Sequence, residues 1–103
     1  MAKDETLPEI DLYELLGCNE NSSYESLRES YIGLIKKFHP DLAPRGLVKI
    51  ATSISQELNL AKCWLLNPEM RERYNGQYRR IKHKPSRLAT FRKKFRVDSI
   101  SDF

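Results

Sequence analysis

The sequence predicts an all-α protein built on an antiparallel hairpin of two long helices, with a short helix before the hairpin and another after it. Two observations support this prediction. Apolar residues recur every three or four positions along two segments of similar length, and no segment shows the period of two that a strand requires. A short loop with proline and glycine separates the two segments, so their apolar faces can pack against each other.

The first short helix is expected between Glu9 and Leu16. This segment carries a cluster of apolar side chains: Ile10, Leu12, Tyr13, Leu15 and Leu16. Gly17 is suited to end the helix, because glycine adopts the left-handed conformation of a helix C-terminus without strain. The residues before this helix, up to Pro8, show no helical pattern, and we predict a flexible N-terminal segment at residues 1–9.

The second helix is predicted from Ser22 to Phe38. Ser22 followed by Glu25 has the spacing of a capping box, in which each side chain bonds the other residue's backbone N–H. The apolar stripe of the helix lies at i, i+4, i+7 and i+11, on Leu27, Tyr31, Leu34 and Phe38. Gly33 lies in the helix interior, where it costs about 1 kcal/mol relative to alanine.

Pro40 ends the second helix, because proline lacks a backbone N–H and excludes the α conformation at the residue before it. His39 and Asp41 are therefore expected on a stiff, exposed turn at a helix end, where binding residues are often found. The alternative interpretation is an ordinary helix-ending turn in which Asp41 serves as a cap.

The third helix follows a loop from Leu42 to about Gly46. Its stripe comprises Ile54, Leu58, Ala61 and Leu65, with Trp64 beside it. This face matches that of the second helix, so we expect the two helices to pair antiparallel. Asn67 and Pro68 then have the residue types of an N-cap and a first helical position, and predict a short fourth helix to about Tyr78. Trp64 and Tyr74 are expected in the core or at its edge.

The charge is divided unevenly along the chain. Residues 1–75 carry 9 Lys or Arg and 12 Asp or Glu, a net charge of −3, whereas residues 76–103 carry 9 and 2, a net charge of +7. We therefore separate a basic C-terminal tail, residues 79–103, from a domain at residues 10–78. Leu88, Phe91 and Phe95 have helical spacing, so part of the tail can form a basic amphipathic helix on a partner or on the domain.

Three interpretations of the tail remain open: a flexible solvated extension, a surface for nucleic acid or an anionic membrane, and a docking segment for a client protein. The candidate contacts are Arg79, Arg80, Lys93 and Lys94. Binding that falls steeply with salt favours nucleic acid or membrane. Salt-insensitive binding that is lost on changing Phe91 and Phe95 favours a protein groove.

Other classes of protein fit the sequence poorly. We find no apolar run of about 18 residues for a membrane span, no secretory or transit signal, and no internal repeat. Cys18 and Cys63 are interpreted as two reduced thiols of a cytoplasmic or nuclear protein, with a single long-range disulfide as the alternative. The cysteines and the two histidines, including His83 in the tail, lack the spacing of a metal site, so we expect no metal and no cofactor. The sequence offers no recognisable group of a nucleophile, a base and a residue that orients the base, so we expect that the chain is not an enzyme.

Three stretches carry a resemblance to a known family. They are "DLYELLG" from Asp11, "SYESLRESYIGLIKKFHPD" ending at Asp41, and "ELNLAKCWLLNPEMRERYN" from Glu57, and together they span about two thirds of the chain. They resemble the J domain of the DnaJ/Hsp40 co-chaperones, and specifically the class that has no glycine/phenylalanine-rich linker and no zinc repeats. The resemblance implies a monomeric co-chaperone that binds ATP-bound Hsp70 and stimulates its ATP hydrolysis.

The resemblance also implies roles for particular residues. Asp41 would pair with an arginine of Hsp70, Pro40 would fix the turn, and His39 would add ring contacts and a hydrogen bond. Three cations of the second helix would face the acidic surface of Hsp70: Arg28, Lys36 and Lys37. Tyr31 would pack or make contact at the edge of that face.

The sequence departs from the family pattern at several positions. Ile32, Gly33 and Leu42 stand where basic residues are usual, and Ser55 and Lys62 stand where aromatic residues are usual. The basic face is thereby reduced to Arg28, Lys36 and Lys37. An alternative function follows from this loss: a J-like scaffold with weak or no stimulation of Hsp70, whose basic tail binds a client protein, nucleic acid or an anionic membrane.

Overall fold

The computed structural model describes residues 6–95, and every regular element in this range is helical, which confirms the all-α prediction. Side chains are described as far as residue 93. The elements are α1 (Leu12–Leu16), α2 (Tyr24–Lys37), the 3-10 helix η2 (Pro40–Leu42), α3 (Val48–Leu65), α4 (Pro68–Gly76), α5 (Tyr78–Ile81) and α6 (Arg87–Phe95).

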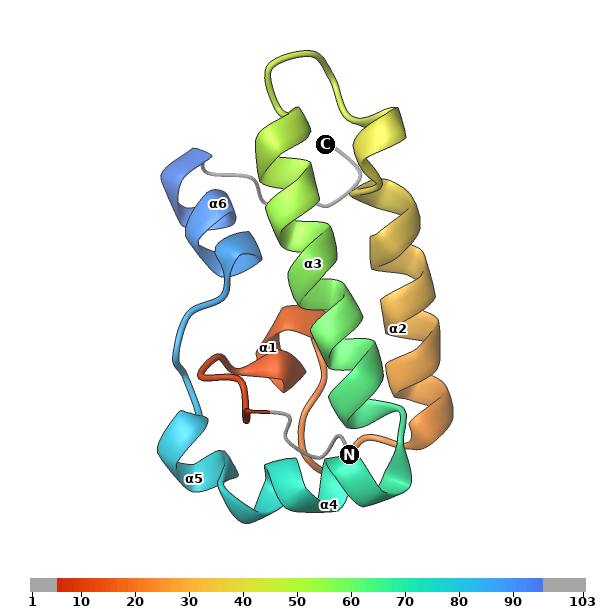
Figure 1. Ribbon diagram of the computed structural model, residues 1–103, viewed down its shortest axis with the longest axis vertical. Coiled ribbons are helices and arrows are strands. Elements are labelled where there is room, and N and C mark those ends of the chain that lie inside the picture. The colour runs from red at the N-terminus through yellow and green to blue at the C-terminus, as the bar shows by residue number, and fades with distance from the viewer. Residues whose placement is uncertain (1–5, 96–103) are drawn as a thin grey trace.

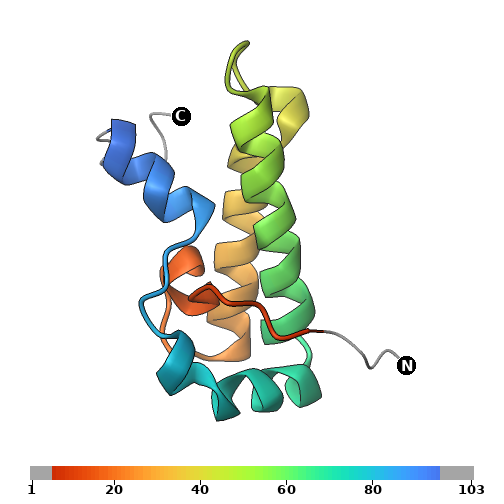
Figure 2. The ribbon, with the colours of Figure 1, turned by 60° about the vertical axis from the view of Figure 1, so that its left-hand side comes forward.

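The helices α2 and α3 form the predicted antiparallel hairpin, which runs along the 38 Å long axis of the molecule (Figure 1). The connecting loop with η2 lies at one end of the hairpin, and α4 and α5 cross the opposite end. The first helix, α1, lies against α3, while α6 packs beside α3 and above α1 in both ribbon views (Figures 1 and 2).

Both ends of α1 are fixed by local chemistry. The helix begins at Leu12, later than predicted, because the side chain of Asp11 caps it: its Oδ1 accepts a hydrogen bond from the N–H of Glu14 at 3.1 Å. Gly17 ends the helix with φ of 72°, as predicted, and a side chain there would strain the backbone.

The capping box predicted at Ser22 and Glu25 was wrong by one position. It is Ser23 whose hydroxyl accepts the N–H of Ser26 at 3.1 Å and begins α2. Ser22 instead accepts the N–H of Asn19 at 3.0 Å and so shapes the preceding turn. Two adjacent serines offer the same chemistry, and only the path of the incoming chain selects the cap.

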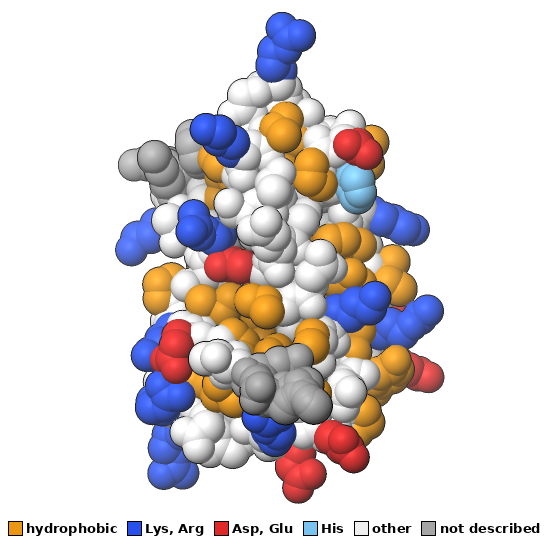
Figure 3. Space-filling view, in the orientation of Figure 1, with side chains coloured by type: hydrophobic (Ala, Val, Ile, Leu, Met, Phe, Trp, Pro, Cys, Tyr) orange, Lys and Arg blue, Asp and Glu red, His pale blue; other side chains and the backbone are white. Residues whose placement is uncertain are grey.

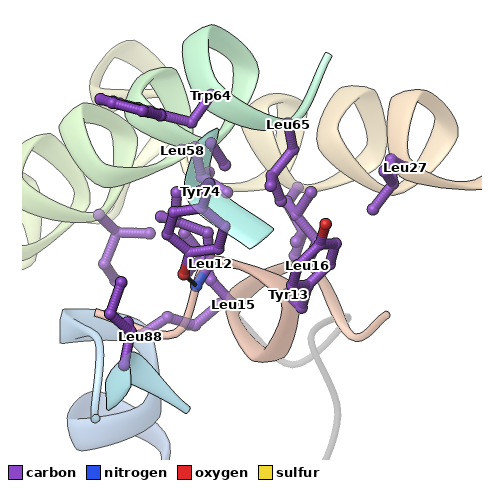
Figure 4. Close-up of a cluster of buried hydrophobic side chains, with 14 of the residues drawn as sticks. Leu12, Tyr13, Leu15, Leu16, Leu27, Leu58, Trp64, Leu65, Tyr74 and Leu88 are labelled. Atoms are coloured by element: carbon purple, nitrogen blue, oxygen red, sulfur yellow. Dashed lines mark hydrogen bonds between the residues drawn. The ribbon is translucent and has the colours of Figure 1, made fainter. Parts of the chain in front are cut away.

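The apolar stripes of the hairpin face each other and form the core with α1. Trp64 and Tyr74 are 1% and 0% exposed, which confirms their predicted place in the core. Figure 4 shows side chains of α1, α3, α4 and α6 directed into one cluster. The buried residues of the predicted stripes are Leu27, Leu34, Phe38, Ile54, Leu58, Ala61 and Leu65, whereas Tyr31 is only partly buried.

The fourth helix begins as predicted but ends earlier. The Oδ1 of Asn67 accepts the N–H groups of Glu69 and Met70 at 3.0 and 3.2 Å, and Pro68 occupies the first turn. The helix ends at Gly76, and Gln77 separates it from the single turn of α5.

Residues 81–91 contribute to the same core. Ile81, Leu88 and Phe91 are 0%, 1% and 7% exposed, so a flexible solvated extension was the wrong interpretation for residues 81–91. The helix predicted in this segment is α6, and its first N–H, that of Arg87, donates to Oε1 of Glu57 on α3 at 2.7 Å. The apolar spacing was correctly identified, but the surrounding positive charge favoured a solvated segment over packing of this helix on the core. The side chain of Phe95 and residues 96–103 lie outside the described residues.

Asp11 ties the start of the domain to this C-terminal segment. It is 2% exposed, and beyond capping α1 its carboxylate accepts the hydroxyl of Tyr78 at 2.8 Å and the N–H of His83 at 2.9 Å. The N–H of Asp11 also donates to the carbonyl of Lys84 at 3.0 Å. Burial, and then the hydrogen bond to Asp11, raise the pKa of Tyr78, which keeps its hydroxyl protonated as a donor.

Cys18 and Cys63 are both free, in agreement with the prediction of two thiols. Between residues 6 and 95, no helix has the length and apolar character that crossing a membrane requires.

Candidate functional site: the His-Pro-Asp turn

The turn that carries His39, Pro40 and Asp41 begins from a buried anchor. Phe38 caps the C-terminus of α2, donates its N–H to the carbonyl of Leu34 at 2.9 Å, and is 1% exposed. Pro40 then starts η2, which closes with the N–H of Leu42 on the carbonyl of His39 at 2.9 Å. The turn is therefore short, locally hydrogen-bonded, and fixed on the side that enters it.

The two polar side chains of the turn point to solvent, as predicted. The His39 and Asp41 side chains are 52% and 87% exposed. Nδ1 of His39 accepts the N–H of Asp41 at 3.1 Å, so this hydrogen bond assigns the ring proton to Nε2. The 3.7 Å approach of Nδ1 to Oδ2 of Asp41 then joins two acceptors and is not an ion pair.

It follows that His39 caps η2, and the alternative in which Asp41 serves as the cap is not what the structure shows. With its ring nitrogen Nδ1 occupied, His39 presents Nε2–H outward as a donor. The carboxylate of Asp41 remains accessible beside it as an acceptor. A partner with a cation and a hydrogen-bond acceptor at matching positions fits this pair.

A second support comes from α3. The hydroxyl of Ser55, which is 8% exposed, donates to the carbonyl of Phe38 at 2.7 Å. This bond ties the carbonyl at the C-terminus of α2 to α3, and it holds the residue immediately before His39. Beside the turn, a hollow of about 400 Å³ opens between α2 and α3 and is lined in part by Ser55 and Pro40.

The predicted binding residues of α2 differ in their accessibility. Arg28, Lys36 and Lys37 are exposed. Tyr31 is partly buried, its hydroxyl donates to Oδ1 of Asn59 at 3.0 Å, and the ammonium of Lys62 lies 6.0 Å from its ring centroid. Tyr31 thus joins α2 to α3, while the cations remain available. Figure 3 shows Lys and Arg side chains along the right edge, over α2.

The candidate tail residues lie apart from the turn. Arg79 and Arg80 belong to α5, at the opposite end of the hairpin, where Figure 3 shows a basic cluster at lower left. Arg80 pairs with Glu9 at 2.8 Å, whereas Arg79 is exposed. Lys93 is exposed on α6, and the side chain of Lys94 lies outside the described residues. The structure does not join this group to the turn.

Sequence reasoning missed two supporting residues. Ser55 was noted only as a departure from an aromatic, although its small polar side chain reaches the end of α2. Asp11 was not singled out, although an aspartate immediately before an apolar helical run is a preferred N-cap. In the part of the chain that the structure describes, no cluster of three or more His, Cys, Asp or Glu could hold a metal ion.

The helical hairpin and its exposed turn define a small all-α domain in which a polar turn joins two antiparallel helices. A comparison with protein families matches residues 11–75 to the DnaJ domain. The chain belongs to the DnaJ domain family.

The relatives of this chain carry the same family name. Over 65 residues, or 63% of this chain, it is 40% identical to a chaperone protein DnaJ of Thermosipho africanus and covers 17% of that protein. Over the same length it is 37% identical to DnaJ homolog subfamily B member 12 of Homo sapiens and covers 16% of it. The chain thus spans about a sixth of the length of these relatives. No solved structure gave a significant match.

Proposed function

We propose that this chain is a co-chaperone that binds Hsp70 in its ATP-bound state and stimulates its ATP hydrolysis. The observation that carries this proposal is the exposed His39 and Asp41 pair on a turn anchored by a buried residue. Membership of the DnaJ domain family supports it. In this proposal the chain performs no chemistry of its own, and the catalytic groups belong to Hsp70.

Each residue of the turn has a physical role in the proposal. Asp41 offers a carboxylate to an arginine of Hsp70, a charge-assisted contact that can be bidentate. His39 contributes its ring and the Nε2–H that its contact with Asp41 leaves free. Pro40 holds the backbone in the conformation that starts η2, so little conformational entropy is lost when the turn binds.

The exposed cations of α2 have a different role. Arg28, Lys36 and Lys37 lie on the helix that leads into the turn, and they would attract an acidic surface of Hsp70. Exposed charges of this kind affect the association rate more than the final affinity. Tyr31 would contribute through packing at the edge of this surface, since its hydroxyl is already bound to Asn59.

A single-turnover ATPase assay with Hsp70 tests the proposal. His39→Gln and Asp41→Asn should abolish stimulation while helicity and melting stay nearly unchanged, because both side chains are exposed. Glu72→Gln is the matched control, since it removes a negative charge from an exposed position on α4. Full stimulation by either turn variant would rule the mechanism out.

The alternative function, in which the tail binds a client protein, nucleic acid or an anionic membrane, rests on exposed cations such as Arg79 and Lys93. Titration of the full chain with single-stranded RNA and with anionic vesicles at increasing salt tests it. Binding with a steep salt dependence would support this role. If the full chain binds neither the RNA nor the vesicles at low salt, a role in nucleic acid or membrane binding is excluded.

A further inference from the structure

Arg92 of α6 is in an unusual environment for an arginine. It follows the buried Phe91 in the chain and is itself only partly exposed. Burial lowers the pKa of its guanidinium. Among the side chains described, no carboxylate forms an ion pair with it. A cation that has lost part of its hydration without gaining a partner gains more from an incoming anion than a fully solvated one does.

The position of Arg92 connects it to α2. It lines a hollow of about 270 Å³, together with Leu15 of α1 and Gly17, which follows that helix. A row on α2 made of Glu29, Gly33 and Lys37 also lines the hollow. Residues four apart lie on the same side of a helix, so this row is one continuous flank of α2.

Gly33 leaves a gap in the middle of that row. A Cβ built on Gly33 meets no atom within 4 Å, so the space beside it is open. Lys37 is the only cation that α2 itself contributes to this hollow. The other cation comes from Arg92, on a helix that joins the fold more than fifty residues later in the chain.

We propose that Arg92 is a binding residue for Hsp70, which acts with Lys37 to receive a carboxylate of the acidic surface on Hsp70. This inference rests on the function proposed above and extends the basic face of α2 onto α6. The hollow holds two cations and one acid, Glu29, so its formal charge favours an anion. The planar guanidinium is also suited to bind a carboxylate through two hydrogen bonds.

This inference gives α6 a role beyond packing. Leu88 and Phe91 fix the helix on the core, and that anchoring holds Arg92 at the edge of the hollow. The basic surface presented to Hsp70 then has contributions from α2 and α6, held at a fixed spacing by α1 and α3.

Arg92→Gln in the full chain tests the inference. We expect the affinity for ATP-bound Hsp70 to fall about fivefold, which is the size of a partly desolvated charge contact. Arg87→Gln is the matched control, because it makes the same change at an exposed position of the same helix, and it should bind like the wild type. Arg92→Lys, which keeps the charge, should retain most of the affinity.

A rescue experiment separates binding from folding. Gly33→Arg adds a cation at another residue that lines the same hollow, where a Cβ meets no atom within 4 Å. The double variant should recover most of the affinity that Arg92→Gln loses. If Arg92→Gln binds like the wild type, or if Gly33→Arg fails to rescue it, the inference is wrong. In either case, loss of binding by His39→Gln would leave the proposed function standing. A wild-type chain that does not bind Hsp70 would overturn both.

Discussion

The two ends of the α2–α3 hairpin are built differently. At the end crossed by α4 and α5, buried polar groups bond one another across the sequence: the hydroxyl of Tyr74 donates to the carbonyl of Ile10 at 2.6 Å and accepts the N–H of Leu12 at 2.8 Å. Asp11 adds its own contacts to this network. At the other end, His39 and Asp41 contact mainly each other, and Ser55 supplies the long-range hydrogen bond.

This contrast predicts that stability and the proposed binding of Hsp70 depend on different ends of the hairpin. Removing a buried partner at the network end leaves unsatisfied donors in the core, and each costs about 1–3 kcal/mol. Changing an exposed side chain of the turn leaves almost nothing unsatisfied. Variants at the network end should therefore lower the free energy of unfolding, whereas variants of the turn should lower the proposed stimulation of Hsp70. Four substitutions test this separation.

The largest effect is expected for Asp11→Ala. It removes the acceptor for the hydroxyl of Tyr78 and for the N–H groups of Glu14 and His83. We expect unfolding by denaturant to show a loss of about 4 kcal/mol, from one buried and two partly buried donors left without partners. Asp41→Ala, at the exposed end, should lose less than about 0.5 kcal/mol. Similar losses for both variants would contradict the contrast between the two ends.

Leu88→Ala comes next, and it tests whether α6 is part of the core. Leu88 is 1% exposed, and Figure 4 shows it directed into the same cluster as Leu12 and Leu15 of α1. Removing its side chain should cost about 3 kcal/mol in thermal or chemical unfolding, through lost burial and a residual cavity. The neighbouring exposed position gives the control, Arg87→Ala. A stability unchanged in Leu88→Ala would mean that the domain folds without α6.

Ser55→Ala should have a smaller effect, of about 1.5 kcal/mol, because it leaves the buried carbonyl of Phe38 without its side-chain partner. We also expect weaker stimulation of Hsp70, since the residue before His39 loses its fixed position. Ser53→Ala, two residues before Ser55 on the same helix, is the control. If Ser55→Ala reduces stability but leaves stimulation at the wild-type level, then Ser55 supports the fold and does not position the turn.

The smallest effect is expected at Glu9, whose side chain is 52% exposed. Hydrogen bonds from Lys84 and then Arg80 hold the pKa of its carboxyl below the ordinary value of 4.5. A lowered folded pKa means that the stabilisation is present above the unfolded pKa and is lost as the pH falls through the folded pKa. Glu9→Gln should therefore lower the melting temperature slightly at neutral pH. Melting curves at acidic pH, where the difference should vanish, check the sign.

The hairpin was predictable because each of its signals is local. Helical spacing located the buried stripes, and Pro40 located the end of α2. The exposed turn followed from the same residues. In contrast, Asp11 bonds to residues about seventy positions away, and no periodicity in the sequence indicates such a contact.

The packing of α6 was hidden for a different reason. The apolar positions Leu88 and Phe91 were visible as a helical pattern, but nine cations against two acids indicated a solvated segment. The structure shows that burial of one face and solvation of the other occur together on this helix. It follows that truncation after residue 78 removes core residues as well as charge, so it cannot isolate the role of the charge.

The hydrogen bond from the N–H of Asp11 to the carbonyl of Lys84 has a consequence for synthesis. A ribosome releases the chain from its N-terminus, so α2, α3 and Tyr74 of α4 emerge before Lys84 does. The hairpin and the packing of α1 on α3 can therefore form early, whereas the bond from the N–H of Asp11 must wait for the segment after α5. A nascent chain halted before Lys84 would expose the His-Pro-Asp turn on a fold whose opposite end still lacks this bond.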